Sequence, residues 1–257
     1  NITINGGTLK TTASFTINTK RGIQLDASNS TINVDASTTL TYAGIIDHQG
    51  SETNNGYTKS GGGTFALSGD STYSGVTTIS AGVITIAHAG SLGSTSGATS
   101  ITSGAALSIS GGITVAEPIT VNGTGVSSGG AIVFTGGNNT YSGAITLGST
   151  STIVSTGGAQ TISATVNGGQ ALTITANGNL VISGAVGGST DLSSYAVTTT
   201  GSASQTFSAN VETTGNQTYT AAGGIVTSGA RTFDSSSGTV NFASALSGNN
   251  NVTVTGN

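Results

Sequence analysis

The chain has 257 residues, of which only 5% are charged, and its formal net charge is −4. It has no Cys, which excludes a disulfide framework, and its only cluster of basic residues is Lys20-Arg21, which argues against a nucleic-acid partner. No run approaches the roughly 18 apolar residues that a membrane-spanning helix requires.

Residues 1–50 contain apolar residues in pairs, each pair separated by one polar residue: Ile2/Ile4, Phe15/Ile17, Ile23/Leu25, Ile32/Val34 and Leu40/Tyr42. Side chains of a strand alternate between its two faces, so each pair places two apolar groups on one face. Low charge with many Gly and Ser residues is also typical of disorder. Disordered chains lack such regular pairs, so the pattern favours short strands.

These strands recur every eight or so residues with a turn after each, which suits a coil with three faces. The pattern predicts an all-β fold, a right-handed parallel β-helix (β-solenoid) of roughly 10–13 rungs with about 20–25 residues each. A rung is one turn of the solenoid. Strands of neighbouring rungs lie about 4.8 Å apart, so the rod would be roughly 50–60 Å long.

Residues 46–58 form the most polar stretch and are predicted to bulge out as a loop. Asp47, His48 and Glu52 are the only tight cluster of titratable groups in the sequence. A carboxylate beside a His can bind a metal or move a proton, but a solvated loop gives the same pattern. Tyr57 is an aromatic candidate for ligand contact in this loop, and Tyr195 is another elsewhere in the chain.

Residues 59–93 read as strand, turn, strand, turn, strand, and weaker copies recur near residues 131–182 and 210–257. Tyr73, Tyr141 and Tyr219 occupy the same corner of the three copies, which favours a structural role for them. The Gly-rich spots also recur within the repeats, so they are interpreted as corners and not as linkers. Residues 1–257 are therefore predicted to form one continuous solenoid.

The residues of the first copy resemble a family motif in which Lys and Gly residues precede an apolar strand, a Tyr and a Thr. The matching positions are Lys59, Gly61, Gly63, Leu67, Gly69, Tyr73, Gly75 and Thr77. Phe65 stands where Leu is usual and Ser71 where Asn is usual, while Asn139 restores that Asn in the second copy. The motif resembles that of the autotransporter-associated β-strand repeats found in bacterial passenger proteins.

The second half is more similar to the repeats of large haemagglutinin-type exoproteins, at residues 184–190 and 214–219. These resemblances imply a secreted, extracellular or cell-surface protein, in which this chain is a structural rod. The partners implied are flanking parts of a longer precursor, other copies of the chain, or host or biofilm surface glycans. The family does not indicate which ligand is bound, because its members differ widely.

Three smaller features complete the survey. Pro118 lacks a backbone donor and is expected at a strand start or corner, and His88 is expected in an exposed turn. Thr pairs occur at 173/175, 198/200 and 253/255. A flat ladder of such pairs suits ice or a crystalline polymer, but the pairs lack a constant spacing. Thr is also the favoured outward residue of a half-exposed strand.

The two ends of the chain carry nearly the same strand pattern: Asn1, Ile2, Thr3 and Ile4 at one end and Asn251, Val252, Thr253 and Val254 at the other. Neither end shows a polar cap, and open strand edges template further pairing. The pattern is compatible with a segment cut from a longer solenoid or with subunits that stack end to end into a fibre.

The sequence predicts no catalytic, cofactor-binding or metal-binding residues. Enzymes of the β-helix class need clustered acidic and basic groups, and the nine acidic residues are scattered along the chain. The function predicted is structural: a rod of an adhesin-like protein that projects or assembles. The alternatives are a polysaccharide- or receptor-binding module that acts through surface loops and, more distantly, a β-helix enzyme that cleaves polysaccharides.

Overall fold

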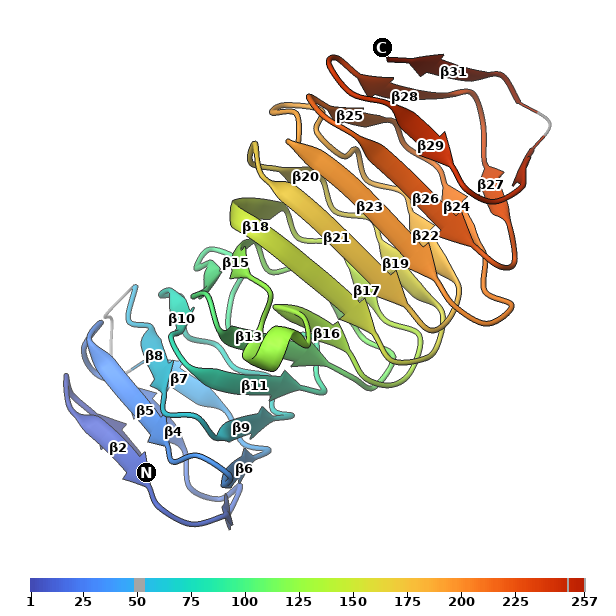
Figure 1. The fold of residues 1–257 in the computed structure, drawn as a ribbon. Helices are drawn as coiled ribbons and strands as arrows, with labels where there is room; N and C mark the ends of the chain where they lie inside the picture. The colour runs from blue at the N-terminus through green and yellow to red at the C-terminus, as the bar shows by residue number, and fades with distance from the viewer. Residues whose placement is uncertain (49–53, 249, 257) are drawn as a thin grey trace.

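The computed structural model describes residues 1–48, 54–248 and 250–256. It is an all-β solenoid of about 11 turns, as the sequence predicted, and strands far apart in the sequence lie side by side along one rod (Figure 1). Every strand pairing in the described part of the chain is parallel. Each complete turn contributes three strand positions, so the solenoid has three faces.

The first face is formed by two groups of hydrogen-bonded strands. The N-terminal group consists of β1 (Ile2–Ile4), β4 (Ile23–Leu25) and β7 (Ile46–His48). Tyr73 and Leu92 fill the core of the next two turns, which have no regular strand at this position. The second group consists of β14 (Thr114–Val115), β17 (Thr140–Tyr141), β19 (Gln160–Ile162), β22 (Leu180–Ile182), β24 (Gln205–Phe207), β27 (Ile225–Thr227) and β30 (Leu246–Ser247).

The second face runs the length of the solenoid. Its strands are β2 (Thr8–Thr11), β5 (Ser30–Val34), β8 (Tyr57–Ser60), β10 (Thr77–Ile79), β12 (Thr99–Ile101), β15 (Ile119–Gly123), the start of β18 (Ile145–Ser155), β20 (Val166–Asn167), β25 (Val211–Thr213), β28 (Arg231–Ser235) and β31 (Val252–Thr255). Between β20 and β25, single β-bridges from Val166 to Val186 and from Val186 to Val211 take the place of a regular strand. Pro118 directly precedes β15, which confirms its expected place at a strand start.

The third face is an uninterrupted ladder. Its strands are β3 (Phe15–Ile17), β6 (Thr39–Tyr42), β9 (Thr64–Leu67), β11 (Gly82–Ile86), β13 (Ala105–Ile109), β16 (Ile132–Phe134), the end of β18, β21 (Ala171–Ala176), β23 (Ser194–Thr199), β26 (Gln217–Ala221) and β29 (Val240–Phe242). Strand β18 is long because it bends around a corner and pairs on two faces.

The core is a set of stacked columns, because parallel strands in register place equivalent residues directly above one another. One column of the third face runs through Phe15, Leu40, Phe65, Ile84, Leu107, Ile132, Ile153, Ile174, Val197, Tyr219 and Phe242. Every member between the two ends is buried. Such columns remove apolar side chains from water, which is the dominant favourable term in folding.

The length of a rung varies because chain can be inserted at a corner without breaking the ladder. Paired positions are 20 residues apart at Thr58 and Thr78, but 26 apart at Thr120 and Thr146. The longer rung contains an excursion with the short 3-10 helix η1 (Val126–Ser128). Corners at the surface tolerate insertions, so a sequence repeat with a fixed period is not required.

The three motif tyrosines are buried, and each hydroxyl is hydrogen-bonded. The Tyr73 hydroxyl lies 2.6 Å from Thr77 Oγ1. The Tyr141 hydroxyl donates to the carbonyl oxygen of Glu117 at 2.8 Å, and that of Tyr219 donates to Gln217 Oε1 at 2.8 Å. Their predicted structural role is confirmed, because none of the three rings is accessible to a ligand. The prediction of a common corner was wrong: Tyr73 and Tyr141 lie on the first face, whereas Tyr219 lies in β26 on the third face.

The Asn position of the motif joins consecutive rungs at the same corner. Asn139 Oδ1 accepts hydrogen bonds from the backbone nitrogens of Gly112 and Ile113 at 3.0 and 3.1 Å. Ser71 occupies this position in the first copy, and its Oγ accepts one hydrogen bond from the nitrogen of Ile46 at 3.3 Å. The shorter Ser side chain therefore replaces only part of the Asn contact.

Truncating Tyr141 tests the contribution of a stacked core residue. Tyr141→Ala removes a fully buried ring and leaves a cavity, so we expect the free energy of unfolding to fall by about 3–5 kcal/mol. Tyr141→Phe removes only the hydroxyl, so we expect a loss of about 1 kcal/mol. Urea unfolding followed by circular dichroism measures both values. Equal losses for the two variants would contradict a packing role for the ring.

Candidate functional site

The predicted ligand loop at residues 46–58 is only partly a loop. Ile46–His48 form β7 and Tyr57 begins β8, so the prediction of a loop across both ends was wrong. The high content of polar residues predicted a loop, but two short strands at the ends of this stretch pair with strands of neighbouring rungs. Glu52 lies outside the described residues.

Asp47 and His48 are adjacent on the surface of β7. Asp47 Oδ1 lies 3.5 Å from His48 Nδ1 and accepts hydrogen bonds from the His48 backbone nitrogen at 2.8 Å and the Thr72 hydroxyl at 2.7 Å. These contacts are local and fix the carboxylate in place. No group of three or more His, Asp or Glu side chains that could hold a metal ion occurs among the described residues.

Tyr57 and Tyr195 were predicted as accessible aromatic residues, and this prediction was wrong. Each is 1% exposed. The Tyr57 ring packs edge-on against Phe65 and Tyr73, with ring centres 6.2 and 5.5 Å away, and Tyr195 packs against Tyr219. Both tyrosines fall on the inward side of their strands, which the sequence alone did not settle because Gly- and Ser-rich strands specify register weakly.

His88 is exposed in a turn, as predicted, and the structure gives it an acidic neighbour. Asp70 Oδ1 lies 3.7 Å from His88 Nδ1, which also accepts a hydrogen bond from the backbone nitrogen of Gly90 at 3.2 Å. Sequence reasoning missed this pair because 18 residues separate its members. A search for residues one rung apart would have found it.

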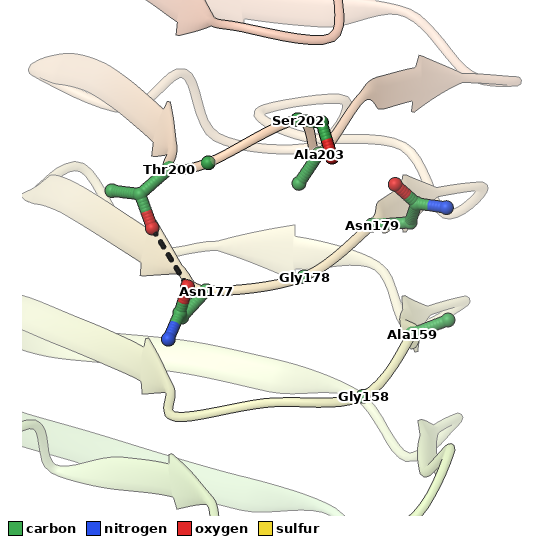
Figure 2. A pocket seen from close by; sticks show the side chains of 9 residues that line it. Gly158, Ala159, Asn177, Gly178, Asn179, Thr200, Ser202 and Ala203 are labelled. Atoms are coloured by element: carbon green, nitrogen blue, oxygen red, sulfur yellow. Dashed lines mark hydrogen bonds between the residues drawn. The ribbon is translucent and has the colours of Figure 1, made fainter.

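The site that the sequence did not indicate is a groove where three consecutive rungs turn from the third face to the first. It follows the ends of β18, β21 and β23 and has a volume of about 550 Å³. We call this groove the corner groove, and Figure 2 shows the residues that line it: Gly158, Ala159, Asn177, Gly178, Asn179, Thr200, Gly201, Ser202 and Ala203.

The floor of the corner groove is formed by backbone atoms, because glycine stands at the centre of each corner turn. A Cβ atom on Gly178 would lie 2.0 Å from the carbonyl oxygen of Gly158, and Gly158 itself has a φ of +77°. Both values favour glycine. The turns therefore stack closely, and the groove follows from this stacking.

The polar side chains of the corner groove are asparagines and hydroxyl residues. The Thr200 hydroxyl donates to Asn177 Oδ1 at 3.0 Å, as Figure 2 shows. Asn179 Oδ1 accepts a hydrogen bond from the backbone nitrogen of Ser204, also at 3.0 Å. The Nδ2 groups of both asparagines donate no hydrogen bond to any described residue, so they are free to donate to a ligand.

Threonine ladders run along more than one face of the solenoid. On the third face, Thr175 pairs with Thr198 and Thr198 with Thr220. A longer series on the second face comprises Thr8, Thr31, Thr58, Thr78, Ser100, Thr120 and Thr146. Regularity on more than one face favours the general role of Thr on half-exposed strands over a single binding surface.

Comparison with known proteins identifies the type of repeat. Residues 58–86 match the model of the passenger-associated-transport-repeat family. The chain is also 34% identical over 154 residues to the adhesin BmaC autotransporter of Brucella suis biovar 1 (strain 1330). The resemblance to autotransporter passenger repeats is confirmed. The aligned segment covers 57% of this chain but only 4% of that adhesin, and no solved structure shows a significant match.

The passenger repeat contains a buried lysine in the solenoid core. Lys59 is fully buried, and its Nζ donates to the carbonyl oxygens of Gly61 at 2.7 Å and Ala81 at 2.9 Å. The ammonium group thus holds two corners together, which explains why the motif begins with Lys. Burial in the apolar core lowers the pKa of Lys59 to about 8.

A buried acid lies outside the matched repeat. Glu117 is 3% exposed, and neither of its carboxylate oxygens has a hydrogen-bond partner among the described residues. Removal from water therefore raises the pKa of Glu117 to about 8. The carboxyl group is closed to solvent, so its effect is on stability and not on binding.

These two groups predict that stability passes through a minimum near pH 8. Between pH 4.5 and 8 the folded chain holds a proton on Glu117 that the unfolded chain has lost, so the free energy of unfolding falls as the pH rises. As the pH rises above 8, the unfolded chain holds a proton on Lys59 that the folded chain has lost, so the free energy of unfolding rises again. This rise ends before pH 10, because burial raises the pKa of several tyrosines, which then keep protons in the folded chain that the unfolded chain loses.

Urea unfolding over this pH range checks the minimum. Glu117→Gln should make the free energy of unfolding nearly independent of pH below the minimum, and Lys59→Met should do the same just above it. The control Glu212→Gln, at a partly exposed position, should keep the minimum. Stability that rises steadily with pH from 4.5 to 8 would show that Glu117 is not buried as an isolated acid.

Proposed function

We propose that this chain is a rod segment of a secreted bacterial surface protein with an adhesin-like role. The observation that carries the proposal is the unbroken parallel ladder, which turns 257 residues into a stiff, repetitive rod (Figure 1). The passenger-associated-transport repeat and the match to an autotransporter adhesin support secretion and exposure at the cell surface. Among the described residues, no helix is long and apolar enough to cross a bilayer.

The role we propose is structural and not enzymatic. Catalysis on a β-helix needs acidic and basic side chains that converge in a groove. The corner groove contains no charged side chain, and the titratable pairs Asp47–His48 and Asp70–His88 lie on the surface away from it. The rod would hold binding elements at a distance from the cell and interact through its own surface.

A second proposal is end-to-end stacking of copies of the chain, which a specific observation favours. Strands β1 and β31 each pair on one side only among the described residues. Apolar side chains on the outermost rungs are also exposed, with Phe15 at 47% and Val254 at 49%. Another rung would cover these groups, supplied either by flanking chain or by a second copy.

Negative-stain electron microscopy over a concentration series tests the rod. We expect isolated rods about 50 Å long, the product of about 11 rungs and a spacing of about 4.8 Å. A compact particle with no long axis would contradict the rod. Filaments that lengthen with concentration would support stacking in place of a solitary stalk.

A charge at an end rung separates the two proposals. Val254→Lys places an ammonium group on the open edge and should abolish filaments, whereas Thr198→Lys, on a side face, should leave them intact. Filaments that survive Val254→Lys would contradict stacking through β31. If wild-type rods remain solitary at every concentration, the stacking proposal fails and the rod proposal stands.

A further inference from the structure

We propose that the corner groove binds a neutral, extended glycan chain that lies along the solenoid axis. The inference rests on the proposed adhesin-like function and names the class of ligand. It moves ligand contact from the predicted loop at Asp47 to a different part of the rod. The groove lies on the outside of three consecutive corners (Figure 2), so a chain-like ligand can enter from solvent.

The chemistry of the lining selects a ligand that both donates and accepts hydrogen bonds. The Nδ2 groups of Asn177 and Asn179 are donors without a partner among the described residues, and the hydroxyls of Thr200 and Ser202 have acceptor capacity. Sugar hydroxyl groups meet both requirements. No Lys, Arg, His, Asp or Glu lines the groove, so a charged ligand would find no opposite charge there to offset the cost of removing its own charge from water.

The shape of the corner groove suits a polymer. Its volume of about 550 Å³ lies within the range of roughly 300–1,000 Å³ that is usual for ligand sites. Equivalent positions recur on three consecutive rungs, about 4.8 Å apart, and two of these rungs carry polar side chains: Asn177 and Asn179 on one, Thr200 and Ser202 on the next. A Cβ atom at Gly201 would meet nothing within 4 Å, so glycine there leaves the backbone open to a ligand.

The corner groove differs from the other hollows of the described surface. A hollow of about 210 Å³ beneath η1 is lined mainly by apolar residues, among them Val83, Ala106, Val126 and Val133. That hollow offers one hydroxyl, from Ser108, and does not extend over the turns of successive rungs. The corner groove, in contrast to that hollow, combines free amide donors with turns of successive rungs.

The lining contains no aromatic ring on which a sugar could stack, so we expect each groove to bind weakly. Aromatic platforms supply much of the contact area in sites that bind tightly. Many rods on one surface would still bind a polymer strongly, because linked sites raise the effective concentration. Weak single-site affinity is therefore part of the inference.

The test is a titration of the uniformly ¹⁵N-labelled chain with three neutral hexasaccharides: cellohexaose, maltohexaose and chitohexaose. The readout is the side-chain amide NMR signals of Asn177 and Asn179, assigned by their loss in Asn177→Asp and Asn179→Asp. We expect at least one neutral hexasaccharide to shift both signals. An acidic hexasaccharide of galacturonic acid should leave both unchanged. If none of the neutral probes shifts either signal, or if the acidic probe shifts them equally, the proposal is overturned.

Matched variants show whether the groove itself is occupied. Ala159→Leu places a larger side chain without an aromatic ring in the groove from an exposed position and should weaken binding about tenfold or more. Ala230→Leu changes an exposed residue at another corner and should not affect it. Asn179→Asp removes a free donor, with Asn216→Asp as its control. Asn216 makes the same 3.0 Å contact to the next rung but lies outside the groove.

The particle shape of each variant distinguishes a loss of glycan binding from a loss of the fold. Rods of unchanged length in electron micrographs show that the fold is intact, so a loss of binding in Ala159→Leu then reports on the groove alone. Binding that persists unchanged in both Ala159→Leu and Asn179→Asp would overturn the inference. The rod function would remain, because it depends on particle shape and not on glycan binding.

Discussion

The hydrogen-bonded parallel ladder between successive rungs is the constraint on which the rest of the structure depends. A single rung has no partner for its backbone groups and no enclosed core, so it is stable only against its neighbours. Parallel pairing in register also places equivalent side chains in columns. One such column, from Leu40 to Tyr219, is buried throughout although its members differ in size. This column therefore accepts apolar residues of different sizes and does not require a particular one.

The same constraint determines how polar groups enter the core. Lys59 and Asn139 are buried because corners of adjacent rungs offer backbone partners at short distance, as the contacts of Lys59 Nζ with Gly61 and Ala81 show. Glu117 occupies a comparable depth without a partner among the described residues. The contrast shows the cost of a polar group in this core: it is low where a corner satisfies the group and high where none does. Glu117 and Lys59 thus give the stability of this interior a dependence on pH.

The outer surface follows from the ladder as well. Outward positions are filled mainly by Thr, Ser and Asn, so the faces present hydroxyls and amides in rows with few charges. Rows of this kind occur on more than one face. Stacked glycine corners leave a groove at Gly158, Gly178 and Gly201. The ligand site that we propose is therefore at a corner, where the lengths and side chains of successive rungs differ.

The sequence by itself determined the architecture, because alternation of apolar and polar residues is a local property. The pairs Ile2/Ile4 to Leu40/Tyr42 and the passenger-repeat motif together indicated a three-faced parallel solenoid of the observed length. Only the tertiary structure decided which positions meet across rungs, because paired positions lie from 19 residues apart, as at Thr64 and Val83, to 28 apart, as at Gly123 and Ser151, and no fixed spacing links them. Tyr57 and Tyr195 consequently proved to be buried, His88 gained Asp70 as a neighbour, and the corner groove appeared. Each depends on the stacking of distant segments, which local patterns do not encode.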